Sequence, residues 1–192
     1  MHIDARIADV LREGLRREGW PKPARALVSD RGGLTRGGIT AANWGDFRQL
    51  GRPATAAELD AITEPEALEF YFQRYVLLPR FDQVLDQRLR ALLIDWAFTS
   101  WSDDPTKALQ AALRVRGLYA GAVDGVLGPK TIAALQSDRD PRQLFRDVLA
   151  ARVRFYIDIA LDGHARALMR SQPTCQLANL KGWVNRCLEF IP

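Results

Sequence analysis

The chain has 192 residues, of which 47% are apolar and 26% are charged. This balance is typical of a globular protein that buries a core, and it excludes disorder over most of the chain. No stretch approaches the roughly 20 apolar residues that cross a membrane, and charges along the first 20 residues leave no apolar segment for a classical signal peptide. We therefore expect neither stable membrane insertion nor signal-directed export.

Cysteine and histidine are scarce in this sequence. Cys175 and Cys187 lie close together in the sequence, near the end of the chain, so they could form a short-loop disulfide or remain two reduced thiols. Synthesis in the cytosol favours the reduced thiols. His2 and His164 are isolated, and no Cys/His pair has the spacing of metal ligands. We expect no metal and no cofactor.

The net charge is 27 − 23 = +4, and the excess lies in residues 141–192, which carry eight basic and four acidic side chains. A basic C-terminal third suits an anionic envelope polymer as a partner, although solvated helix faces would give the same pattern. No helix-turn-helix or zinc pattern accompanies this charge, so we expect no nucleic-acid partner.

In chain order, apolar residues at helical spacing first predict a helix over about 3–18, which Gly19, Trp20 and Pro21 end. Proline and glycine clusters exclude a helix over most of 21–40 and leave room for a small hairpin near 28–40. The next helices are expected at capping residues, namely at Thr40, at Thr55 with Glu58, and at Thr63 with Glu66.

The second half predicts further helices separated by short loops. The first, over about 82–100, should turn Val84, Leu85, Leu89, Leu92, Leu93 and Trp96 inward. The others are expected from Asp104 and Pro105 to Gly117, over 129–136, from Pro141 to a stop at Gly163, and over 176–190. The fold class is therefore all-α, with at most the small hairpin near 28–40.

The first candidate for chemistry is Glu18, at the end of the first helix and before a glycine-rich loop that holds Asp30 and Thr35. The negative end of a helix disfavours ionisation of a carboxyl group, and a general acid in glycoside cleavage must keep its proton. Glycines in the loop would let the backbone approach a sugar closely. The alternative is a surface glutamate followed by an ordinary turn.

Two other segments stand out, and the first of them is explained by structure alone, without a ligand. DGVLGPKT, residues 124–131, has a turn at Asp124 and Gly125 and a helix start at Pro129. LKGWVNR, residues 180–186, carries Trp183, which suits either a core anchor or a platform for a sugar ring.

These segments together resemble one family of enzymes. LRREGW followed by SDRGGLTRGGIT resembles the start of the family-108 glycoside hydrolases, which are N-acetylmuramidases found as bacteriophage endolysins and as muramidases that help bacterial secretion. EPEALEFYFQRYV and LIDWAFTS resemble two further segments of that family. DGVLGPKTIAAL and LKGWVNR are similar to the peptidoglycan-binding half that accompanies it.

The resemblance implies a lysozyme-like helical fold, with a catalytic muramidase lobe over 1–102 and a peptidoglycan-binding helical lobe over 103–192 packed against it. It implies cleavage of the β-1,4 bond between N-acetylmuramic acid and N-acetylglucosamine in bacterial peptidoglycan. The implied catalytic residues are Glu18, Asp30 and Thr35, and the implied substrate-binding residues are Trp44, Tyr71, Tyr75 and Asp95.

The chain also departs from the family pattern. The gap between Glu18 and Asp30 is about three residues longer than usual, and Thr99 and Trp101 replace the family's asparagine and glycine. Glu13, followed by Gly14, offers a second alignment for the acid, but it would place the carboxyl within the helix.

We expect a monomeric phage endolysin, made in the host cytoplasm without a signal peptide and acting in the periplasm or cell wall after release. A secretion-associated bacterial muramidase, a lytic transglycosylase and a non-catalytic wall-binding protein are the alternatives. A loop-borne Asp30 as base, with Thr35 orienting a water, predicts inversion at the anomeric carbon.

Overall fold

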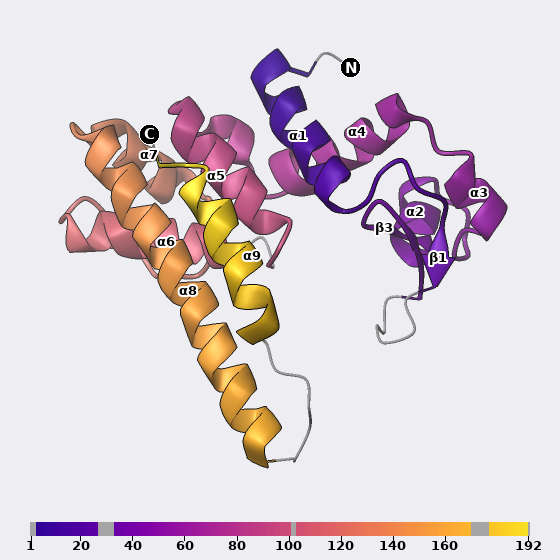
Figure 1. The fold of residues 1–192 in the computed structure, drawn as a ribbon. Helices are drawn as coiled ribbons and strands as arrows, with labels where there is room; N and C mark the ends of the chain where they lie inside the picture. Colours follow the sequence, from indigo (N-terminus) through magenta and orange to yellow (C-terminus); the bar gives the residue numbers. More distant parts are fainter. Residues whose placement is uncertain (1–2, 27–32, 101–102, 170–176, 192) are drawn as a thin grey trace. The chain divides into compact units, whose positions relative to one another are not determined.

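The structure of the protein is a computed structural model. It describes residues 3–26, 33–100, 103–169 and 177–191. The chain divides into two compact units, Met1–Leu78 and Pro79–Pro192. Figure 1 labels the helices and strands of both units.

The first unit begins with α1 (Ala5–Arg17), close to the expected range of 3–18. The Asp4 carboxylate caps it by accepting from the backbone N–H groups of Arg6 at 3.0 Å and Ile7 at 3.3 Å. Apolar residues at helical spacing, among them Leu11 and Leu15, are buried on one face of α1, and the helix packs on α4 (Glu64–Phe72). Burial of this face fixes which way the end of α1 points.

A small antiparallel sheet follows, in the order β1 (Arg25–Ala26), β2 (Leu34–Arg36) and β3 (Ile39–Thr40). The β2–β3 pair lies within the expected hairpin region, and β1 adds a third short strand. Asp30 lies outside the described residues.

Capping residues start the other helices of this unit as expected. The Thr40 hydroxyl accepts from the Asn43 N–H at 3.2 Å, and the Glu58 carboxylate accepts from the Thr55 N–H at 2.7 Å. The helices are α2 (Ala41–Phe47), α3 (Ala56–Asp60) and α4, which continues into the π-helical turn η1 (Gln73–Leu77).

The second unit is helical throughout its described elements. Its longest helix, α8, packs against α5, α6 and α9 (Figure 1). The elements are η2 (Phe81–Gln83), α5 (Gln87–Ala97), α6 (Asp103–Val115), α7 (Pro129–Ser137), α8 (Pro141–Met169) and α9 (Leu177–Leu188).

Two predicted details of this unit are wrong. The helix expected from residue 82 begins only at Gln87, because the Asp86 carboxylate caps it by accepting from the Leu89 N–H at 2.8 Å. Leu85 therefore precedes the helix and is 77% exposed, although it was expected on the inner face. The stop expected at Gly163 is also absent, since α8 continues to Met169; a glycine within a helix costs only about 1 kcal/mol, which the rest of a long helix outweighs.

The expected all-α, lysozyme-like helical class with little β structure is confirmed. None of the helices in the described part of the chain is long and apolar enough to cross a membrane.

Candidate active site

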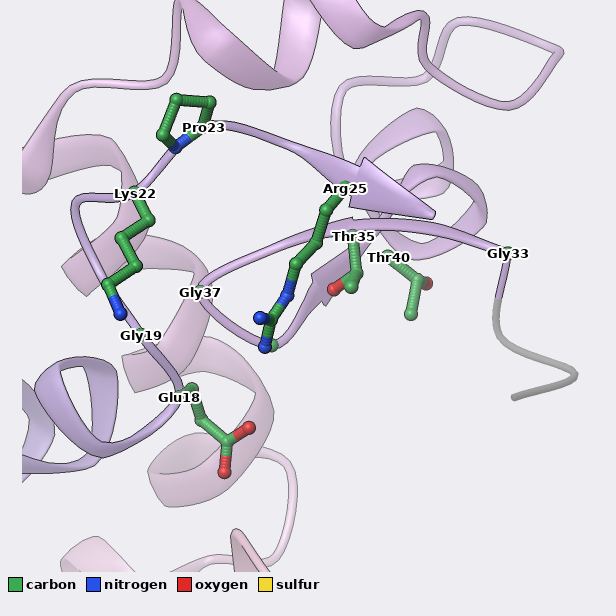
Figure 2. A pocket seen from close by; sticks show the side chains of 10 residues that line it. Glu18, Gly19, Lys22, Pro23, Arg25, Gly33, Thr35, Gly37 and Thr40 are labelled. Atoms are coloured by element: carbon green, nitrogen blue, oxygen red, sulfur yellow. The ribbon is translucent and has the colours of Figure 1, made fainter. Parts of the chain in front are cut away.

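Glu18 lies where α1 ends, at the edge of a pocket of about 190 Å³ in the first unit (Figure 2). Its backbone N–H still donates to the Gly14 carbonyl at 3.1 Å, so the last helical turn fixes its main chain. Gly19 follows with φ +91°, which turns the chain away from the helix. The pocket is lined by Glu18, Gly19, Lys22, Pro23, Arg25, Gly33, Thr35, Gly37, Gly38 and Thr40.

The three strands supply the other wall of this pocket. Arg25 pairs with Thr35 across β1 and β2, and Thr35 pairs with Thr40 across β2 and β3. Directly paired residues share one face of a sheet, so the three side chains form a row along the pocket (Figure 2). The Thr35 hydroxyl donates to the Ile39 carbonyl at 3.2 Å, which orients its oxygen.

The turn between β2 and β3 explains why the sequence has two glycines there. Gly37 and Gly38 have φ of +51° and +73°, the signs of a type I′ hairpin turn. A Cβ on Gly38 would lie 2.6 Å from the Tyr71 hydroxyl oxygen and 3.1 Å from Cγ of Glu18. The turn therefore packs directly on Glu18, and no larger residue fits without moving one of these groups.

Two tyrosines of the α4–η1 segment support this arrangement from behind. Tyr71 is 1% exposed, and its hydroxyl donates to the Gly37 carbonyl at 2.6 Å. Its ring lies 5.1 Å from that of Tyr75. Burial raises the pKa of the Tyr75 phenol; the Arg74 guanidinium opposes this shift, and the negative charge of Glu18 adds to it. Tyr75 is thus within electrostatic range of Glu18.

Arg36 holds the hairpin to the chain before α4. Its guanidinium donates to the carbonyls of Leu59 at 2.9 Å and Ile62 at 2.8 Å, and it lies 4.2 Å from the centroid of the Trp20 ring. A Cβ on Gly37 would come within 2.9 Å of that same ring. The residues just after Glu18 and the turn facing it are therefore packed together.

The structure weighs against Glu13 as the acid. Its carboxylate forms ion pairs with Arg16 at 2.7 Å and Arg17 at 2.8 Å. The hydrogen bond from Arg16 is the chief cause that lowers the pKa of Glu13 to about 2. A carboxyl that is ionised throughout the neutral range has no proton to donate.

The residues expected to bind substrate do not line this pocket. Trp44 is 4% exposed and stacks on Phe47 at 5.2 Å within the core of the first unit. Tyr71 and Tyr75 lie behind the pocket wall, as described above. Asp95 belongs to α5 in the second unit.

Asp95 is the centre of a buried ion cluster. Its carboxylate lies 2.7 Å from Arg152 of α8 and 2.7 Å from Arg186 of α9, and Arg152 is fully buried. Burial alone would raise the pKa of Asp95, but the hydrogen bonds and charges of Arg186 and Arg152 lower it overall. A carboxylate this enclosed holds three helices of the second unit together.

The DGVLGPKT loop is organised around a buried side chain of α6, Gln110. Its amide donates to Asp124 at 2.8 Å, and its carbonyl oxygen accepts from the Gly125 N–H at 2.9 Å. Asp124 also accepts from the Val126 N–H at 2.9 Å. This network confirms the turn predicted at Asp124 and Gly125. Trp183 of α9 stacks on Tyr156, which is 1% exposed, at 5.2 Å.

The sequence alone missed Lys22 and Arg25 as lining residues of the pocket. Arg25 reaches the pocket through the pairing of β1 with β2, which places it opposite Thr35 and which no local sequence signal indicated. Within the described ranges, no group of three acidic, histidine or cysteine side chains is placed to hold a metal ion.

Comparison with known proteins finds similarity along most of the chain. Residues 11–100 match the family model "Glycosyl hydrolase 108", and residues 104–188 match "Predicted Peptidoglycan domain". A solved structure of SagA from Brucella abortus is similar in fold, with a TM-score of 0.64 and 22% identity over 96% of this chain and 94% of that one. None of the curated proteins compared with the chain matches it. The two matched segments indicate a glycoside hydrolase that acts on peptidoglycan.

Proposed function

We propose that this chain is an N-acetylmuramidase that uses Glu18 as the general acid to cleave the β-1,4 bond between N-acetylmuramic acid and N-acetylglucosamine. One observation carries the proposal. Glu18 ends α1 at the edge of a pocket whose facing wall is the glycine turn and the row of Arg25 and Thr35. The glycosyl hydrolase match covers this whole pocket.

The proposed reaction begins with proton transfer from the Glu18 carboxyl to the glycosidic oxygen. The bond from that oxygen to the anomeric carbon then breaks, and the leaving sugar departs as an alcohol. Water adds to the anomeric carbon, and a base takes its proton. We assign the base to Asp30 and the orientation of the water to Thr35, whose hydroxyl lines the pocket.

Cations at the pocket favour an acidic substrate over a neutral one. Lys22 and Arg25 are both exposed lining residues. Neither side chain forms an ion pair with any residue in the described ranges. Muramic acid units carry carboxylates on their lactyl group or peptide stem, whereas a chitin-like chain carries none. The charge of this wall therefore suits a muramic acid unit better than a neutral aminosugar chain.

The test compares two glutamates of the same helix. Glu18→Gln keeps the size of the side chain but removes the transferable proton, and general acid catalysis contributes about 10² to 10⁴-fold. Purified peptidoglycan should be cleaved at least 100-fold more slowly by Glu18→Gln, while Glu13→Gln, its matched control, keeps wild-type activity.

The products decide the reaction type. Mass spectrometry of the wild-type digest should show reducing ends on N-acetylmuramic acid. Anhydro-muramyl ends would identify a lytic transglycosylase instead, and unchanged activity of Glu18→Gln would remove this residue from the mechanism.

We also propose that the enzyme serves host lysis by a bacteriophage, acting as a monomer after release from the cytoplasm. The support is the resemblance of its motifs to phage endolysins. Expression in bacteria with a pore-forming holin should lyse the cells, and expression without one should not. Lysis without a pore would argue for another route to the wall.

A further inference from the structure

The second unit contains a groove that the hydrolytic pocket does not use. It has a volume of about 680 Å³ and lies between the start of α5, the first turns of α8 and the chain that follows α9. All of its lining residues belong to the second unit. It is therefore separate from the pocket at Glu18, which the first unit forms alone.

The floor of this groove is apolar. Phe145 and Leu149 lie one turn apart on α8 and are 6% and 8% exposed. Phe190 and Ile191 close the groove from the end of the chain, and Ile191 is 56% exposed. Arg152 of the buried ion cluster lies 5.7 Å from the Phe190 ring centroid, so the floor is continuous with a rigid part of the core.

The rim of the groove is positively charged. Arg88 lies over the Phe145 ring at 5.0 Å, and Arg142 and Arg146 lie one turn apart on α8. All three are exposed, and none forms an ion pair with a residue that the structure describes. Asp86 is the single acidic lining residue, and its carboxylate already caps α5. Among the described residues, the three arginines of the rim therefore have no carboxylate as an ion-pair partner.

We propose that this groove binds the peptide stem of peptidoglycan through its free carboxylates; the identity of the polymer rests on the proposed function. The stem combines small apolar side chains, which suit the floor of Phe145 and Leu149, with several carboxylates on neighbouring residues. Arginine is suited to such groups because its planar fork donates two hydrogen bonds to one carboxylate. A neutral glycan backbone has no carboxylate with which the arginines of the rim could pair.

The location of the groove supports this ligand. Arg142, Arg146 and Phe145 lie within residues 104–188, which match the peptidoglycan domain. A groove formed largely by this segment, with Asp86 and Arg88 added from the start of α5, would hold the wall by its peptides, while the pocket at Glu18 acts on the glycan.

Binding is measured with the full-length Glu18→Gln protein, so that the ligand is not cleaved. The probe is a disaccharide tetrapeptide with free carboxylates, compared by calorimetry with the same compound in which all carboxylates are amidated. Removing one charged hydrogen bond costs about 1.5–3 kcal/mol, or roughly tenfold or more in affinity. We expect amidation to weaken binding at least tenfold.

The variant test replaces two arginines and keeps the net charge matched. Arg142→Gln combined with Arg146→Gln should weaken binding of the acidic probe at least tenfold. Arg139→Gln combined with Arg154→Gln removes the same charge from exposed positions outside the groove, and it should leave the affinity within twofold. Thermal unfolding of both double variants checks that they are folded.

Three results would overturn the proposal. The first is equal affinity for the acidic and amidated probes, which needs no variant. The second is an equal loss in both double variants, which would show a general charge effect. The third is displacement of the probe by vesicles of anionic phospholipid, which would assign the groove to a membrane. A failure of the muramidase proposal would differ, since it would change the cleavage products and leave this binding intact.

Discussion

Gly38 gives the sharpest test of how the pocket is built. Replacing it with alanine adds one carbon where the Tyr71 hydroxyl oxygen would lie at 2.6 Å and Cγ of Glu18 at 3.1 Å. Both distances are shorter than ordinary van der Waals contact, so the tyrosine or the glutamate must move. The φ of +73° adds strain of its own for any residue with a Cβ.

The magnitude follows from these two terms. A left-handed conformation costs an alanine about 1–2 kcal/mol. Displacing Tyr71 loses its hydrogen bond to Gly37, which contributes about 0.5–1.5 kcal/mol. Gly38→Ala should therefore destabilise the first unit by about 1.5–3.5 kcal/mol. Activity should also fall about 10- to 100-fold, because a small displacement of a catalytic group has a large effect on rate.

The assay is urea unfolding together with hydrolysis of purified peptidoglycan. Gly51→Ala is the control, since Gly51 has φ +68° but no atom within 4 Å of an added Cβ. Gly51→Ala should lose only the stability that the left-handed conformation costs, about 1–2 kcal/mol, and should keep its activity. In a Tyr71→Phe background, which lacks the clashing hydroxyl, Gly38→Ala should be milder by about 1 kcal/mol. If Gly38→Ala and Gly51→Ala behave alike in stability and rate, the close packing of the turn on Glu18 has no role.

The second unit gives further predictions. Asp95→Asn should destabilise it by about 3–5 kcal/mol in urea unfolding, because the fully buried Arg152 would lose its counter-charge; a loss under 1 kcal/mol would contradict the cluster's role. The lowered pKa of Asp95 means that its contribution is present above the unfolded value of about 3.9 and is lost as the pH falls through the folded value. Wild-type stability should thus fall more steeply below about pH 4 than that of Asp95→Asn, and parallel pH profiles would exclude this linkage. Gln110→Leu should lower the free energy of unfolding by about 2–4 kcal/mol, since the loop at Asp124 loses its buried hydrogen-bond partner. An unchanged urea midpoint would show that the loop keeps its conformation without Gln110. Asp86→Ala should cost about 1 kcal/mol through loss of the cap, and no change would mean that α5 does not depend on it.

Much of the fold could be predicted because the signals were local. Apolar spacing gave α1, and the capping residues Thr40 and Thr55 gave the starts of α2 and α3. The start of α5 was misplaced because Val84 and Leu85 fit a helical pattern as well as a short extended segment. Only the cap at Asp86, whose carboxylate bonds to the Leu89 N–H, separates the two.

The candidate site was less predictable, because its geometry depends on contacts distant in sequence. Glu18 and Thr35 were expected from the motif, and both line the pocket. Arg25 lines the pocket because β1 pairs with β2, which sets Arg25 opposite Thr35. Neither helical spacing nor a capping residue predicts that pairing. The partners of Asp95 lie 57 and 91 positions away, so nothing near it in the sequence showed that two arginines enclose it.

The ion cluster at Asp95 also limits how this protein can be divided or recombined. Asp95 lies in the segment that matches the glycosyl hydrolase, whereas Arg152 and Arg186 lie in the segment that matches the peptidoglycan domain. A truncation at residue 100 would remove both arginines and with them the two ion pairs of this buried carboxylate. A chimaera that joins this hydrolase segment to another peptidoglycan domain would need arginines at equivalent positions. A cut between Leu78 and Pro79 would keep the whole cluster on one fragment. The boundary between the two matched segments, near residue 100, is therefore not the place at which this chain can be divided.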